Sequence, residues 1–100
     1  MADKVMQLSK DGCNPPSVNI SIRGKDVVII QSTDDFCVNS IVLQPGGESN
    51  PFPRPLPWPQ QGFKNQLTSG AARDGTQGTY KLSGTFSDGT PYDPIVIIDQ

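Results

Sequence analysis

The sequence predicts one all-β domain over residues 1–100, a Greek-key β-sandwich of about seven strands. Strong helix formers are scarce, because nine of the ten acidic residues are Asp and only three residues are Ala. Gly and Pro together make up a fifth of the chain without any period, which is typical of turns between short strands. Short β-branched segments recur between these turns, which completes the all-β pattern.

Residues 5–30 contain three predicted strands, the third of which has the composition of a central strand. Residues 5–8 are short and apolar, and Asp-Gly and Pro-Pro pairs make residues 10–16 a loop. Residues 18–22 alternate apolar and polar side chains, which predicts a half-buried strand. A turn at residues 23–26 leads into the β-branched run at residues 27–30, which predicts a strand covered on both faces.

The next segment is predicted to be a polar loop at residues 31–35 and a strand at residues 38–43, with Ile41 and Leu43 on one face. Residues 44–61 differ, because every second residue from 51 to 59 is Pro and has no backbone donor.

The proline-rich segment at residues 44–61 is predicted to be a stiff, extended surface loop. Its apolar side chains Phe52, Leu56 and Trp58 are expected to close over one end of the core. The alternative is a ligand for an SH3-type domain, which needs prolines three residues apart, whereas these are two apart.

The last third predicts two clear strands. Residues 63–67 are a weaker strand candidate, and residues 73–78 form a turn. Residues 79–86 alternate, with Tyr80, Leu82 and Phe86 on one face. After a tight loop at residues 87–91, the β-branched residues 95–98 form the final strand.

Two segments resemble the cupredoxin family, of the plastocyanin and azurin type. The first is Pro-Pro-Ser-Val-Asn-Ile-Ser-Ile-Arg-Gly-Lys-Asp-Val-Val-Ile-Ile at residues 15–30, and it is similar to the family's early strand, Gly-containing turn and next strand. The second is Gly-Thr-Tyr-Lys-Leu-Ser-Gly at residues 78–84, followed by residues 95–98, and it resembles the strand, ligand loop and last strand. The resemblance implies a sandwich in which the first strand pairs with the third and the 87–93 loop lies beside residues 31–39.

The copper ligands of that family have no counterpart here. A blue-copper site uses two His, a Cys thiolate and a weak axial ligand. The matching positions hold Asn39, Gly84, Ser87 and Tyr92, and the chain has no His at all. The resemblance therefore implies a copper-free relative, and we expect no cofactor and no metal site.

Immunoglobulin-like domains are the alternative. The segment Asp-Gly-Thr-Gln-Gly-Thr-Tyr at residues 74–80 resembles their tyrosine corner, in which the Tyr hydroxyl bonds to backbone upstream. Leu82 stands where the second core Cys of that family would be. An adhesion or stalk domain is the function that this alternative implies.

The cupredoxin resemblance implies that the loops after Lys10, Gln31 and Ser87 meet at one end of the sandwich, here called the loop end. This arrangement would place Cys13 and Cys37 together and predicts a disulfide between them. A bridge would favour a periplasmic or secreted location. The alternative is two reduced, partly buried thiols.

The absence of His removes the commonest general base and every Ser-His or Cys-His nucleophile pair. A small carboxylate-based hydrolase centred on Asp34, Asp35 or Asp88 is a remote alternative, although adjacent carboxylates on a strand point to opposite faces. Asp88 and Asp93 are also a weak candidate pair for calcium.

The net charge is −2 and the basic residues are scattered singly, which predicts no nucleic-acid binding. No apolar run approaches the roughly 20 residues of a membrane span. We therefore expect a non-enzymatic binding or structural module. A protein partner would contact the loop end through the aromatic residues Phe36, Phe52, Trp58 and Tyr92. The alternative is that each of these rings packs at the end of the core.

Overall fold

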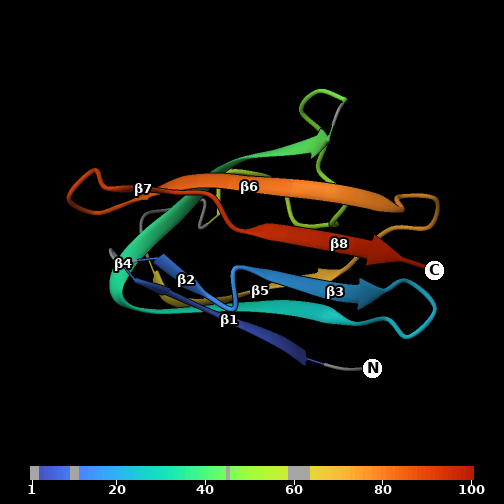
Figure 1. The fold of residues 1–100 in the computed structure, drawn as a ribbon, viewed down its shortest axis with the longest axis horizontal. Coiled ribbons are helices and arrows are strands. Elements are labelled where there is room, and N and C mark those ends of the chain that lie inside the picture. The colour runs from blue at the N-terminus through green and yellow to red at the C-terminus, as the bar shows by residue number, and fades with distance from the viewer. Residues whose placement is uncertain (1–2, 10–11, 45, 59–63) are drawn as a thin grey trace.

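The structure is a computed structural model that describes residues 3–9, 12–44, 46–58 and 64–100. The described residues form strands and turns without any helix, which confirms the all-β prediction (Figure 1). Parts of the predicted loops at 10–16 and 44–61, and the start of the strand predicted at 63–67, lie outside the described residues. The described part contains no helix with the length and apolar character needed to cross a membrane. The strands are β1 (Asp3–Ser9), β2 (Gly12–Asn14), β3 (Ser17–Ser21), β4 (Val27–Gln44), β5 (Lys64–Ala71), β6 (Gly78–Phe86), β7 (Pro91–Tyr92) and β8 (Ile95–Asp99).

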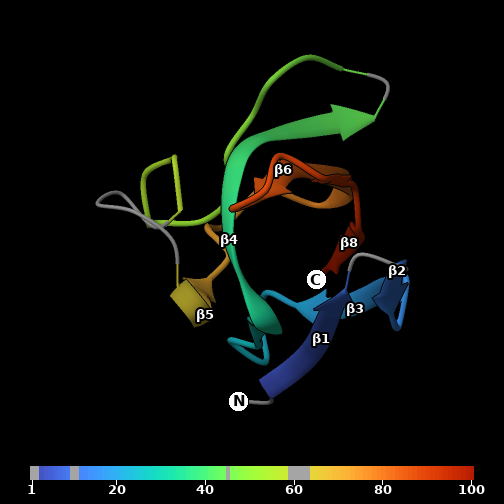
Figure 2. The same cartoon turned by 90° about the vertical axis from the view of Figure 1, so that its left-hand side faces the viewer.

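The strands follow the order β2-β1-β4-β6-β8-β3, with β5 paired to β4 and β7 paired to β6. Seen along the strands, this sheet curls until β3 approaches β1, so that it nearly closes into a barrel-like sandwich (Figure 2). One layer contains β1, β2, β5 and the first part of β4, and the other contains β6, β8 and the second part of β4. Strand β3 pairs with β8 and approaches β1, so it closes the gap between the layers (Figure 2).

Strand β4 is continuous for 18 residues, so the prediction of a polar loop at residues 31–35 is wrong. Gln31 pairs with Gln66 of β5, and after a register shift Phe36 pairs with Lys64 of β5 on one side and with Phe86 of β6 on the other. The strand therefore bends from one layer into the other. Its polar residues mark this bend, where one side of the backbone changes partners, and β4 remains a strand throughout.

Two pairs of strands run parallel. Val5 of β1 lies opposite Ile29 of β4, and Val18 of β3 lies opposite Val96 of β8. At the loop end, the backbone N–H of Ser87 donates to the carbonyl of Asp35 at 3.0 Å. The turn after β6 is thereby fixed beside the bend of β4 (Figure 1).

The core lies between the two layers and is filled from alternating strand positions. Tyr80, Leu82 and Phe86 of β6 are buried, as their spacing predicts. The Tyr80 hydroxyl donates to the carbonyl of Thr76 at 2.8 Å, which makes the tie expected of a tyrosine corner.

The proline-rich segment covers one side of this core. Phe52 and Trp58 are fully buried with their ring centroids 5.6 Å apart, and Leu56 packs against the core. The Trp58 N–H donates to the carbonyl of Val38 at 2.8 Å, and the indole Nε1 donates to the carbonyl of Arg54 at 2.9 Å. The segment thus closes over the core as expected, and its buried aromatics argue against an exposed SH3 ligand.

We predict that Trp58→Ala lowers the free energy of unfolding by about 3–5 kcal/mol, because it removes the largest fully buried side chain and leaves a cavity. Chemical denaturation measures this change. Val5→Ala is the control, since Val5 is 39% exposed and its truncation should cost only about 0.5 kcal/mol. Similar losses in both variants would contradict the core role of Trp58.

Candidate functional site

A short turn and a two-residue strand build the loop end. The N–H of Phe86 donates to the carbonyl of Thr90 at 2.9 Å, and Asp88 Oδ1 accepts from the N–H of Thr90 at 3.0 Å. Gly89 takes a φ of 91°, which favours glycine. The turn reverses the chain, so that Tyr92 of β7 pairs directly with Gly84 of β6.

The Tyr92 ring fills the space above Gly84. A Cβ atom built on Gly84 would lie 2.6 Å from the hydroxyl oxygen and 2.8 Å from Cζ of Tyr92, and it would also collide with the carbonyl oxygen of Cys37. The ring stacks edge-on against Phe36 with centroids 6.4 Å apart and tilts against Phe86 at 5.3 Å. Only glycine fits at residue 84 while this aromatic cluster stays in place.

The Tyr92 hydroxyl is buried and has no hydrogen-bond partner among the described residues. Burial raises the pKa of this phenol well above its usual range, and the nearby Cys37 and Cys13 raise it further. The hydroxyl is therefore neutral at every physiological pH. A buried hydroxyl without a partner costs about 1–3 kcal/mol, so Tyr92 is held there at a cost in stability.

The four positions that match copper ligands do not form a ligand set. Gly84 and Tyr92 are adjacent, but one has no side chain and the other is a neutral phenol. Asn39 is the extra residue at a register shift between Val38 and Ser40, and its side chain is exposed. Ser87 is exposed as well. The residues present therefore do not fit copper, and across the described ranges no three Cys, Asp or Glu side chains gather to hold a metal.

Both cysteines lie near Tyr92, because Cys13 lines the same pocket as Tyr92, and the carbonyl of Cys37 and the hydroxyl of Tyr92 both lie beside Gly84. The structure contains no disulfide between them. Cys13 Sγ donates to the carbonyl of Pro15 at 3.2 Å, and Cys37 Sγ donates to Asn39 Oδ1 at 3.4 Å. Desolvation raises the pKa of Cys13 to about 11 and also raises that of Cys37, so both are protonated, weakly nucleophilic thiols at neutral pH.

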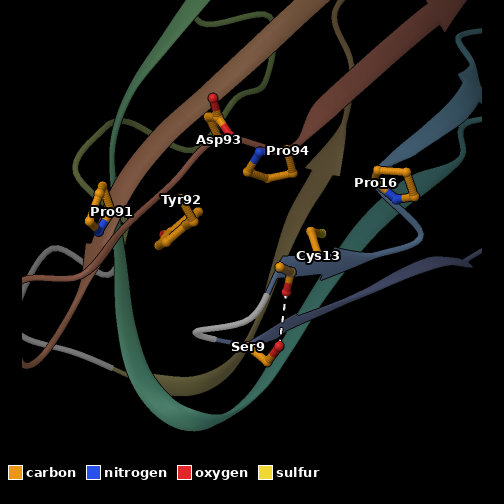
Figure 3. Close-up of a pocket in the computed structure, with 8 residues that line it drawn as sticks. Ser9, Cys13, Pro16, Pro91, Tyr92, Asp93 and Pro94 are labelled. Atoms are coloured by element: carbon orange, nitrogen blue, oxygen red, sulfur yellow. Dashed lines mark hydrogen bonds between the residues drawn. The ribbon is translucent and has the colours of Figure 1, made fainter.

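A pocket of about 260 Å³ opens beside this cluster. Tyr92, Asp93 and three prolines form much of its wall and face Ser9 and Cys13 (Figure 3). Ser9 Oγ donates to the carbonyl of Gly12 at 3.0 Å, which ties the wall on the β1–β2 side. Asp93 makes an exposed ion pair with Lys81 at 3.2 Å. Among the described residues, the pocket therefore offers the Cys13 thiol, the Ser9 hydroxyl and the ion-paired Asp93 carboxylate. Its prolines are Pro16, Pro91 and Pro94.

The four aromatic residues considered as surface contacts belong to the core, which agrees with the alternative of end-of-core packing and not with surface contact. Phe36, Phe52 and Trp58 are 0% exposed and Tyr92 is 9% exposed. Phe36 turns inward where β4 crosses between the layers. Phe52 and Trp58 are carried by the proline-rich segment, and their rings belong to the same hydrophobic core. None of them offers the accessible area that an interface contact requires.

The acidic residues do not converge either. Asp34 and Asp35 are consecutive on β4, so their side chains leave opposite faces of the strand. Asp88 Oδ1 accepts a hydrogen bond from the N–H of Thr90 in its own turn, and Asp93 forms an ion pair with Lys81. The geometry thus supports neither a carboxylate pair for hydrolysis nor a calcium site at Asp88 and Asp93.

Sequence reasoning missed the proline wall of the pocket. The spacing Pro-Tyr-Asp-Pro at residues 91–94 was the available signal, because two prolines that flank one aromatic residue hold it in an extended segment. Pro16 could not be added from the sequence, since it reaches the same wall only through the pairing of β3 with β8.

The comparisons with known proteins add no relative to this picture. No family model matches the chain, and no curated protein matches it either.

We predict that Tyr92→Phe raises the free energy of unfolding by about 1 kcal/mol, because it removes a buried hydroxyl that has no partner. Tyr80→Phe is the matched control and should lower it by about 1 kcal/mol, since that hydroxyl donates to Thr76. Denaturation of both variants under the same conditions measures the two changes. Destabilisation by Tyr92→Phe would show that its hydroxyl has an acceptor.

Proposed function

We propose that this chain is a non-enzymatic binding or structural module built on a copper-free, cupredoxin-like β-sandwich. The observation that carries the proposal is the packing of Tyr92 on Gly84, because a neutral aromatic ring closes the position where the family carries its metal. Hydrophobic contact among Phe36, Phe86 and Tyr92 replaces metal ligation as the means of tying this end together.

The strand pairing supports the cupredoxin-like arrangement. Strand β1 and the start of β4 are the strands predicted at residues 5–8 and 27–30, which are the first and third of the family pattern. These two strands pair in parallel. The hydrogen bond from Ser87 to Asp35 brings the 87–93 loop beside residues 31–39, as the same pattern requires.

An immunoglobulin-like adhesion or stalk domain is the second candidate, and one observation favours it. The tyrosine corner between Tyr80 and Thr76 is a feature of that group. The parallel pairing of β1 with β4 is the reason to prefer the cupredoxin-like arrangement.

A non-enzymatic role is supported by the chemistry of the side chains. With no His in the sequence, the commonest general base is missing, and the acids and thiols are two sets that could take its place. Asp34 and Asp35 diverge, and raised pKa values keep Cys13 and Cys37 protonated. Neither set provides the activated group that a hydrolase needs.

We predict that one equivalent of Cu(II) produces no intense visible thiolate-to-copper absorption and no shift in Tm, because the ligand positions hold Gly84, Ser87 and Tyr92. Visible absorption and thermal unfolding, with and without the metal, measure this. Zn(II) serves as the control for non-specific effects of a divalent cation. A strong charge-transfer band at one equivalent would overturn the copper-free proposal.

We also propose that Cys13 and Cys37 form a disulfide in an oxidising compartment, which would make the protein periplasmic or secreted. Their shared proximity to Tyr92, which lines a pocket with Cys13 and lies beside Gly84 together with the carbonyl of Cys37, supports this proposal. Exchange with a small disulfide such as oxidised glutathione would join the two sulfur atoms and release two glutathione thiols.

We expect the protein, after incubation with that disulfide, to lose the mass of two hydrogens and to resist alkylation until it is reduced. Intact-mass spectrometry without a reductant measures both outcomes, and Cys37→Ser is the control that cannot form the bridge. Two alkylatable thiols after this incubation would refute the bridge.

A further inference from the structure

Four side-chain amides form a row across the outer face of the β2-β1-β4-β5 layer. Gln7 of β1 lies opposite Asn14 of β2 on one side and opposite Gln31 of β4 on the other. Gln31 in turn lies opposite Gln66 of β5. Residues directly opposite one another in neighbouring strands share a face, so all four amides project from the same side.

This side faces solvent. Met6 and Leu8, the neighbours of Gln7, are buried in the core, so Gln7 points outward, and Gln66 is exposed. With strands about 4.8 Å apart, the row is about 14 Å long. Gln31 Nε2 donates to Gln66 Oε1 at 3.2 Å, which orients two of the amides before any ligand arrives.

The row lies in a hollow of about 610 Å³, larger than the pocket beside Tyr92. None of the described residues in its wall is charged. Besides the four amides they are Leu8, Ser9, Gly12, Ser32 and Thr33. Solvent-facing strands usually gain their solubility from charged side chains, so a wall of amides and hydroxyls requires another explanation.

An apolar strip borders the amides. The next row on the same face contains Val5, Ile29 and Thr68, and Val5 is the one large hydrophobic residue that is exposed among those described. The face therefore combines a row of hydrogen-bond donors and acceptors with a neighbouring row that contains apolar side chains.

We propose that this amide row is a binding site for a neutral oligosaccharide. A carboxamide both donates and accepts hydrogen bonds, as a sugar hydroxyl does, so a row of amides matches a chain of uncharged sugars. The C–H faces of the sugar rings would pack on Val5 and Ile29. The described residues of the lining include none of the cations that an anionic ligand requires.

The shape of the face favours a sugar over two other ligands, a peptide strand and a second copy of this chain. A peptide strand would add at a sheet edge through its backbone, whereas this row crosses four strands on their face. A second copy of the chain would leave the hollow unfilled unless a matching ridge projected into it. The inference rests on the proposed role as a binding module, and it places the ligand away from the closed aromatic cluster.

We expect wild-type protein to bind at least one of two neutral probes, cellohexaose or laminarihexaose, and not the anionic hexamer of galacturonic acid. The double variant Gln7→Ala, Gln66→Ala should weaken binding at least about tenfold, because two donor-acceptor groups are lost. Gln44→Ala removes an exposed amide from another part of β4 and should leave affinity unchanged. Isothermal titration gives the affinities, and thermal unfolding shows whether each variant keeps its fold.

Absence of binding to both neutral probes, or equal binding of the anionic hexamer, would overturn the sugar site. Dimerisation of the wild type that the double variant abolishes, measured by analytical ultracentrifugation, would assign the face to a second copy and also overturn it. These outcomes leave the copper result untouched, so failure of the sugar site is separable from failure of the copper-free proposal.

Discussion

The rest of the structure depends on the course of β4, one strand that belongs to both layers. Its first part pairs with β1 and β5, and its second part pairs with β6. The change of partners between Gln31 and Phe36 brings the two layers face to face and turns Phe36 into the core.

The bend explains why the loop end is closed by packing. Once Phe36 points inward, Phe86 and Tyr92 can pack against it, and the ring of Tyr92 lies on the bare backbone of Gly84. This cluster buries a hydroxyl without a partner, which packing against two other aromatic rings helps to offset. An end closed in this way resembles a sealed core more than an open reactive site.

Because the loop end is closed by packing, a ligand would contact a different surface of the molecule. The aromatic residues that would suit an interface are buried, whereas the outer face of the β1 layer presents uncharged polar groups in register. The two regions meet at Ser9 and Gly12, which line both the small pocket beside Tyr92 and the larger hollow. A ligand on the sheet face would therefore lie next to the cluster without entering it.

The sequence by itself determined the class of fold and most strands, because a period of two and frequent turn residues are local signals, as at residues 79–86. It also determined that no imidazole could bind copper. Only the tertiary structure decided that residues 31–35 are strand, that Phe36 and Trp58 are core, and that four distant amides share one row. The physical reason is that burial and register depend on which strands pair, and this pairing joins segments far apart in the chain.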